Sequence, residues 1–226
     1  MRKNPGRSAR TQNENGRQAQ KSRETKKAIL EATIRCFVDY GYVHTTLTRI
    51  ADYANVSRGA MSHHYESRKD VILSAVAYLY EKRLMEYRRL IAAATRGFGN
   101  RADVAVTRAG LEQTVRALWK YFNLPSYKAH IELYVAARTN HELAAVMEPL
   151  ERQYEAEIPK IIRNLFPVWE QLEEARELLS DLLLFTLKGM STSYMYHHKK
   201  ERLENMLNHL VDDCVSVYES STPQTR

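Results

Sequence analysis

The sequence predicts an all-α protein, and three observations carry that prediction. Apolar residues recur at three- and four-residue spacing along most of the chain after Glu24, as they do on the buried face of a helix. No stretch alternates between apolar and polar residues with period two, so we predict no β-sheet. A length of 226 residues, with 44% hydrophobic and 27% charged residues, is typical of one or two compact globular domains.

The basic excess of the chain is confined to its N-terminal end. Residues 1–27 contain nine Lys or Arg and two Glu, which accounts for the whole formal net charge of +7. Residues 1–22 are rich in Asn, Gln, Gly, Ser and Arg and have almost no apolar side chains, so we expect a disordered basic tail. Such a tail either keeps the protein soluble or follows the phosphates and the minor groove of a nucleic acid.

Residues 23–68 are expected to form a small helical domain. A first helix from Glu24 to Tyr40 carries an apolar stripe and ends at Gly41, a residue that suits the backbone of a helix C-terminus. Thr46 is a suitable N-cap for a second helix from Leu47 to Ala54.

A third helix follows a tight turn at Asn55, which tolerates a left-handed backbone, and begins after a second N-cap residue, Ser57. Its inward positions are Ala60, Met61 and Tyr65. Its outward positions carry short or hydrogen-bonding side chains, namely Arg58, Gly59, Ser62, His63 and His64. A helix with a packed back and a polar, partly basic front can enter the major groove of DNA. Spacing alone leaves an ordinary helical hairpin equally open.

Residues at many fixed offsets in this part of the chain form one pattern. They are Ala32, Phe37, Tyr40-Gly41-Tyr42, Thr45-Thr46, Ile50-Ala51, Val56-Ser57, Gly59, His64-Tyr65 and Lys69. With this pattern the segment from Ala28 to about Leu73, about a fifth of the chain, resembles the DNA-binding domain of the TetR (tetracycline-repressor-like) transcriptional regulators. Two positions depart from it: Asn55 stands where the family usually has Gly, and Ser62 where a Tyr often contacts phosphate.

The resemblance implies a helix-turn-helix head that binds double-stranded DNA. Carried over residue by residue, it assigns phosphate contacts to Thr46, His64 and Lys69. It assigns base-edge contacts to Arg58, Gly59 and His63, and Arg49 joins either set. The predicted DNA-binding set is therefore Thr46, Arg49, Ser57, Arg58, Gly59, Ser62, His63, His64 and Lys69.

Residues 69–220 are expected to form a helical body for ligand binding and dimerisation, followed by a disordered tail over 221–226. A helix from about Lys69 to Ala94, long enough to link a head to a body, comes before a glycine-containing break at 97–100. Further helices are expected over 103–122, from 126, from 140 to 166, over 172–197 and over 201–218. Pro149 and Pro159 should each end or kink the helix that contains them.

The last two predicted helices carry more apolar surface than one protomer is expected to cover. Residues 172–197 are apolar over a broad arc, and the stripe from Leu203 to Val217 has near-heptad spacing. Pairing with a second copy across a two-fold axis would bury both faces in a four-helix bundle. Capping of the body's own core is the alternative, and the resemblance favours the homodimer.

Several function classes have no support in the sequence. It contains no Gly-rich phosphate loop, no Ser/His/Asp set in a nucleophile-elbow context and no Cys pair with zinc spacing, so we expect no enzyme activity, metal site or cofactor. Cys36 and Cys214 are expected to be buried free thiols. No run approaches the ~18 apolar residues of a membrane span, and the basic N-terminus lacks the apolar core of a signal peptide. We therefore expect a cytoplasmic protein without a membrane partner.

The body also contains residues suited to a ligand site, a mostly apolar cavity with a few polar groups. The candidate effector-binding residues are Trp119, Phe122, His130, Tyr134, Arg138 and Phe185, although aromatic residues at helical spacing are more often plain core. With the resemblance, these features predict a ligand-responsive repressor that binds a palindromic operator as a dimer and is released by a small lipophilic effector. The alternative is a helical interaction module whose basic tail binds RNA or anionic membrane non-specifically.

Overall fold

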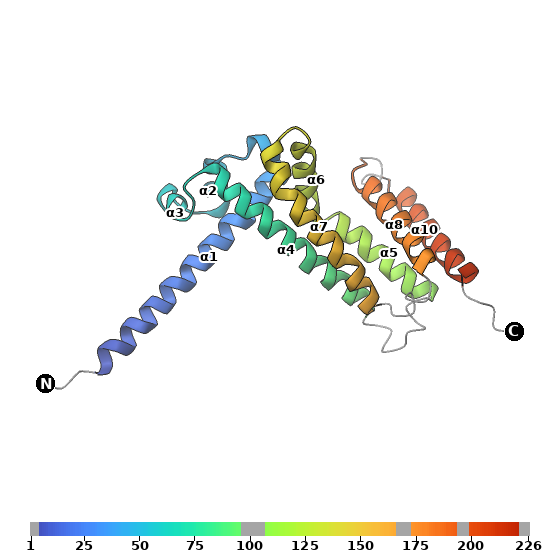
Figure 1. Cartoon of the computed structure of the whole chain (residues 1–226), viewed down its shortest axis with the longest axis horizontal. Coiled ribbons are helices and arrows are strands. Elements are labelled where there is room, and N and C mark those ends of the chain that lie inside the picture. The colour runs from blue at the N-terminus through green and yellow to red at the C-terminus, as the bar shows by residue number, and fades with distance from the viewer. Residues whose placement is uncertain (1–4, 96–106, 166–172, 194–198, 222–226) are drawn as a thin grey trace. The chain divides into compact units, whose positions relative to one another are not determined.

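The computed structural model describes residues 5–95, 107–165, 173–193 and 199–221 (Figure 1). Every regular element in these ranges is a helix, and none of the described residues forms a strand, so the predicted all-α class is confirmed. Among the same residues no helix is both long and apolar enough to cross a membrane.

The first helix, α1 (Pro5–His44), begins much earlier than expected. The predicted disordered tail over residues 1–22 is therefore wrong from Pro5 onward. Proline suits the first helical position, and the Arg, Gln, Lys and Ala residues that follow extend an existing helix at little cost. The predicted break at Gly41 is present, since Gly41 has φ 73° and the helix is kinked there.

The next two helices begin after the predicted N-caps, and α2 also ends where predicted. Helix α2 spans Leu47–Ala54, and the Thr46 side chain accepts a hydrogen bond from the backbone amide of Arg49. Asn55 ends this helix in the left-handed conformation, with φ 53°. Helix α3 spans Arg58–His64, and the Ser57 side chain accepts from the amide of Ala60.

The chain divides into two compact units. The first contains residues Met1–Leu79 and Ala129–Met147, and the second contains Tyr80–Lys128 and Glu148–Arg226. Helices α4 (Arg68–Thr95), α6 (Pro125–Ala137) and α7 (His141–Leu165) each contribute residues to both units. The first unit is thus larger than the 23–68 domain expected from the sequence, because it also contains the start of α4 and the non-adjacent segment Ala129–Met147.

The second unit is built around α5 (Arg108–Phe122), α8 (Glu173–Ser191) and α10 (Lys200–Ser221). Helix α5 packs against α8 and α10, which also pack against each other. Helix α5 begins at Arg108 and not near residue 103, because Thr107 is its N-cap and accepts from the amide of Gly110. The predicted break at 97–100 and the final tail lie outside the described residues.

Helix α7 runs without interruption through Pro149 and Pro159, so, of the two predicted effects, neither proline ends the helix. A proline inside a helix leaves the carbonyl of the residue four positions earlier without its amide partner. Those residues, Ala145 and Glu155, are both exposed, so water can supply the missing hydrogen bond.

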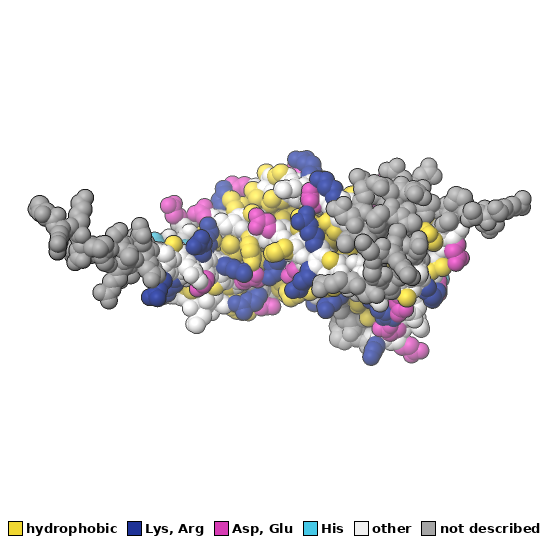
Figure 2. Space-filling view, turned by 90° about the horizontal axis from the view of Figure 1, so that it is seen from below, with side chains coloured by type: hydrophobic (Ala, Val, Ile, Leu, Met, Phe, Trp, Pro, Cys, Tyr) yellow, Lys and Arg dark blue, Asp and Glu magenta, His cyan; other side chains and the backbone are white. Residues whose placement is uncertain are grey.

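Both signs of charge are interspersed over the face drawn in Figure 2, with hydrophobic side chains exposed between them. No single-sign field covers the described part of this face. This agrees with the sequence, in which the basic excess lies ahead of residue 28.

Candidate functional site

Helix α3 has the two faces that the sequence predicts. On its inner side Met61 is 3% exposed, and Tyr65 just after the helix is 5% exposed. On its outer side Arg58, Ser62 and His63 are exposed. The Ser62 hydroxyl donates to the backbone carbonyl oxygen of Arg58 at 3.0 Å, so it is used within the helix but its oxygen can still accept. The outer face is therefore a short polar ridge on a firmly packed back.

Gly59 lies exposed in the first turn of α3. A Cβ atom built on it would meet only the Oγ of Ser57, at 3.9 Å, which is ordinary van der Waals contact. The fold of the protomer therefore has room for alanine at this position. Glycine weakens a helix relative to alanine, so packing among the described residues does not account for a glycine at this position.

The guanidinium of Arg49 is engaged within the first unit. Its Nη1 donates to the carbonyl oxygen of His44 at 2.5 Å, and its guanidinium lies 4.3 Å from the centroid of the Tyr40 ring. Arg49 thus ties α2 to the end of α1. Thr46 is exposed, and its oxygen serves as the cap of α2 while its hydrogen remains available for donation.

Lys69 and His64 border the outer face of α3. The Nζ of Lys69 lies 3.0 Å from the Oε1 of Glu142 in an exposed ion pair within the first unit. His64 is half-buried, and its pKa is lowered by burial and by the nearby charges of His63 and Lys26. Each of these two side chains thus interacts with a neighbour within the first unit.

Arg68, which sequence reasoning did not select, fixes the start of α4. Its Nε donates to the carbonyl oxygen of Thr45 at 2.6 Å, and its Nη2 to that of Tyr42 at 2.5 Å. Its guanidinium also lies 5.1 Å from the Tyr42 ring centroid, and the Tyr42 hydroxyl accepts from Asn140. No periodic pattern marks such a residue, because it acts across a turn and not along a helix face.

Comparison with known proteins identifies the fold of this head. The sequence profile of the family described as "Bacterial regulatory proteins, tetR family" matches residues 29–75, which contain α2, α3 and the packed part of α1. The chain belongs to the TetR family. It is therefore a transcriptional regulator with a helix-turn-helix head, and not an enzyme.

Two relatives of this TetR-family chain are similar over most of their length. The HTH-type transcriptional regulator CymR of Pseudomonas putida is 24% identical over 201 residues, which cover 84% of this chain and 89% of that protein. The HTH-type transcriptional repressor BepR of Brucella suis is 25% identical over 183 residues, covering 78% and 83%.

Two solved structures show the same fold. A putative TetR-family transcriptional regulator from Mesorhizobium loti aligns with a TM-score of 0.63 at 15% identity, covering 87% of this chain and 97% of that chain. A TetR-family regulator from Marinobacter aquaeolei aligns with a TM-score of 0.56 at 16% identity, with the same coverage.

The second unit of the TetR-family chain contains a cavity of about 500 Å³. Helices α4, α5, α7 and α8 line it, and Phe122 and Phe185 are among the lining residues. The wall also contains the tyrosines Tyr87, Tyr121 and Tyr154. Burial raises the pKa of all three, so their hydroxyl groups are neutral at physiological pH and can donate or accept hydrogen bonds.

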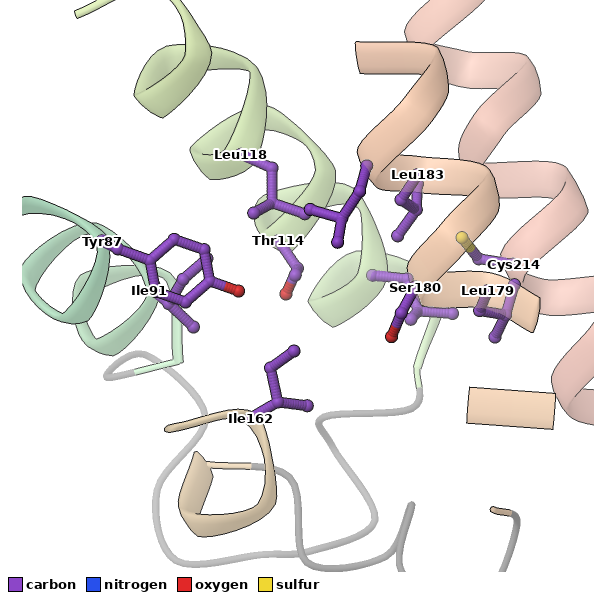
Figure 3. A pocket seen from close by; sticks show the side chains of 11 residues that line it. Tyr87, Ile91, Thr114, Leu118, Ile162, Leu179, Ser180, Leu183 and Cys214 are labelled. Atoms are coloured by element: carbon purple, nitrogen blue, oxygen red, sulfur yellow. The ribbon is translucent and has the colours of Figure 1, made fainter. Parts of the chain in front are cut away.

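A smaller cavity of about 80 Å³ lies in the same unit (Figure 3). Side chains from α4, α5, α7, α8 and α10 point into it, and most are apolar, including Ile91, Leu118 and Leu183. It is too small for a separate drug-sized ligand, which needs about 300–1,000 Å³. Both cavities are lined by Tyr87, Ile162, Ser180 and Leu184, so they adjoin.

The structure brings together only two of the six predicted effector residues, Phe122 and Phe185. Trp119 is half-buried and lines neither of these two cavities. His130, Tyr134 and Arg138 belong to the first unit, where His130 is buried and the other two are exposed.

Sequence reasoning missed Arg83 as a lining residue of the larger cavity. A signal existed, because Tyr80, Arg83 and Tyr87 are spaced three and four residues apart on one helix. The arginine obscured the apolar stripe to which its tyrosine neighbours belong.

Proposed function

We propose that the protein is a homodimeric repressor that binds an inverted-repeat operator and releases it when a small, largely apolar effector enters the second unit. The observation that carries this proposal is the outer face of α3. Its polar ridge is exposed and its back is buried, while the Ser57 side chain caps its start and the backbone N–H of Tyr65 caps its end. A helix of this kind is pre-organised to enter a major groove.

Eight of the nine predicted contacts have a role in this proposal. Arg58, Gly59 and His63 face base edges, and Ser57 and Ser62 flank them. Thr46, His64 and Lys69 hold phosphates on either side. We leave Arg49 out of the proposed contacts, because its guanidinium is held by His44 and Tyr40.

The proposed dimer interface is the outer face of α8. Leu178, Leu182 and Phe185 follow one another at helical spacing and are 61%, 36% and 69% exposed. A large apolar stripe of this kind favours burial against a second copy. The stripe expected on α10 instead packs within the protomer, since Leu207 and Leu210 are each 2% exposed.

The name of BepR, a repressor, supports repression over activation for this chain. Release by an effector is supported by the larger cavity, whose volume of about 500 Å³ lies within the usual range for small ligands. Helix α4 carries residues of both units, so a ligand that shifts its second half would also act on its first half. A roughly 100-fold difference in ligand affinity between the two states, about 2.7 kcal/mol, would suffice to release the operator.

The test begins with selection of bound duplexes from a random DNA library by the full chain. We expect an inverted repeat whose half-sites lie on one face of the duplex, about one helical turn apart. Arg58→Ala should weaken binding to this sequence by about 1–3 kcal/mol and relax the preference at one base step. Lys69→Ala should weaken binding to selected and random duplexes alike.

The outcome that contradicts the proposal is enrichment of no sequence, with binding to DNA, RNA and anionic vesicles that disappears together as salt is raised. That outcome would support the alternative of a non-specific anion-binding module. The basic residues of α1 would then be sufficient for binding, because electrostatic contacts to phosphates carry no sequence preference.

A further inference from the structure

The cavity proposed as the effector site has a buried arginine in its wall. Arg83 lies on α4 and is only 2% exposed. Its guanidinium lies 4.3 Å from the ring centroid of Tyr154 and 5.2 Å from that of Tyr80. Arginine remains protonated in proteins, so a full positive charge is buried beside the cavity.

The protein supplies few acceptors for this charge. One carboxylate faces it, but the Oε2 of Glu151 is 3.8 Å from Nη1 and also accepts from the Tyr80 hydroxyl. Arg83 further hydrogen-bonds Tyr121. Within the described part of the chain, neither Nε nor Nη1 of Arg83 has a hydrogen-bond partner. Buried N–H groups without acceptors are costly, which indicates that another molecule completes this site.

A second donor lies in the same wall. The hydroxyl groups of Tyr121 and Tyr154 share one hydrogen bond of 2.5 Å. In such a pair one hydroxyl donates and the accepting one keeps its own hydrogen for another partner. Since both residues line the cavity with Arg83, hydrogen-bond donors gather on one side of it.

The wall is mostly apolar where the two cavities adjoin, in contrast to the donor-rich side at Arg83. The small cavity is walled by Leu111, Leu118, Leu179 and Leu183, and Tyr87 and Leu184 belong to both spaces (Figure 3). A ligand bound through a polar group at Arg83 would have an apolar region within reach for the rest of the molecule.

We propose that the ligand is a monocarboxylic acid with an apolar or aromatic body, held by Arg83 through its carboxylate. This inference rests on the proposed effector role of the cavity and names its ligand class. A carboxylate supplies both the missing acceptor and a compensating charge, and such charge-assisted bonds are about twice as strong as neutral ones. Glu155, Glu177 and Asp181 also line the cavity, but they are exposed and therefore screened by water.

The test compares three probes that differ only in the polar group, namely 4-phenylbutyrate, 4-phenylbutanol and 4-phenylbutylamine. Binding to the full chain is measured by titration calorimetry, without DNA. We expect the acid to bind at least about tenfold more tightly than the alcohol, and the amine to bind most weakly, because a hydrogen bond to a charged group contributes about 1.5–3 kcal/mol.

Arg83→Met should abolish the preference for the acid. Arg88→Met is the matched control, because Arg88 lies on the same helix but is exposed and paired with Glu157. If Arg83→Met does not fold, the order of affinities in the unaltered protein decides. Equal affinity for acid and alcohol, or no binding of the acid at millimolar concentration, overturns the inference.

A separate measurement tests the proposed function. Release of a selected operator duplex by 4-phenylbutyrate is followed by fluorescence anisotropy. Arginine-dependent binding of the acid without release of DNA would leave the ligand class intact and contradict the effector role. Release of DNA by the alcohol as readily as by the acid would support the effector role and contradict the proposed ligand class.

Discussion

Single side chains fix the geometry of the recognition helix. Ser57 caps the start of α3, Thr46 caps the start of α2, and Asn55 makes the left-handed turn between them. Each of these effects is local and depends on the side chain within one or two residues of its backbone partner.

Gly59→Ala should stabilise the folded protein and at the same time weaken its binding to DNA. Alanine raises helix propensity, so the free energy of unfolding should rise by about 0.5–1 kcal/mol, because the protomer has room for the methyl group. The same methyl group would collide with a base edge, and affinity for the selected operator should fall at least about tenfold. Thermal melting and anisotropy measure the two effects. Thr48→Ala, on the exposed face of α2, is the control, and unchanged operator affinity in Gly59→Ala would contradict the assignment.

The pKa of His64 predicts a pH-dependent affinity for DNA. Burial lowers this pKa from its ordinary value in the free protein, so the imidazole is neutral near pH 7. A phosphate favours the protonated form, and DNA binding should therefore take up a proton. Affinity should rise as the pH falls from about 7.5 to about 6, by up to about tenfold per pH unit. His64→Gln should flatten this dependence, and an equally steep profile in that variant would remove His64 from the phosphate contacts.

At the scale of elements, the head is joined to α7 by a polar contact. Lys69, at the start of α4, pairs with Glu142 in the first turn of α7. The lysine expected to hold a phosphate is therefore held by a carboxylate in the structure described here. Both side chains are exposed, so the pair is weak and can exchange its partner for DNA.

Glu142→Gln should strengthen DNA binding. It removes the competitor of Lys69 and one negative charge near the phosphates, so affinity should increase about two- to fivefold at low salt. The change should be the same for operator and random duplexes. Glu148→Gln is the matched control, because Glu148 forms an exposed ion pair with Arg152 on the same helix. Equal effects of the two substitutions would show that the pairing with Lys69 is unimportant.

At the scale of the whole molecule, the proposed dimer would depend on the apolar stripe of α8, which a single chain leaves exposed. The double substitution Leu178→Glu and Leu182→Glu should raise the dimer dissociation constant at least about 100-fold, because four unpaired carboxylates would be buried at the interface. Thermal stability of the protomer should change little, since both leucines are exposed.

Sedimentation measures the effect of the double substitution on assembly. Met85→Glu, on the exposed face of α4, is the control and should leave the dimer unchanged. Leu207→Glu should instead unfold the second unit, because Leu207 is buried inside it. A dimer that survives the double substitution would place the interface elsewhere.

The effector should act by changing the separation of the two heads. Val43, which is 72% exposed, can be replaced by Cys and crosslinked while the dimer is bound to operator. The native thiols should not interfere, because Cys36 and Cys214 are buried and burial raises their pKa to about 11 and about 12. The crosslinked dimer should retain DNA in the presence of an effector that releases the free dimer. If both lose DNA equally, the proposed movement is wrong.

The sequence by itself determined those features of the fold that depend on residues close together in the chain. The helical class, the limits of α2, the start of α3, their N-caps and the outward face of α3 follow from helical spacing and from side chains acting within one turn. The family pattern added the predicted DNA contacts at known offsets. The sequence did not predict the helix over residues 5–22 or the continuity of α7 through two prolines, because weak local preferences yield to an adjoining helix.

Only the tertiary structure decided which residues from distant segments meet. It placed Arg83 with Tyr121 and Tyr154 in one cavity wall and removed His130 and Tyr134 from it. Of the two helices expected to present apolar surface, it left the stripe of α8 exposed and buried that of α10, because α5 packs against α10. Helical periodicity reveals that a face is buried, but not which partner buries it, since that choice depends on contacts between residues far apart in the chain.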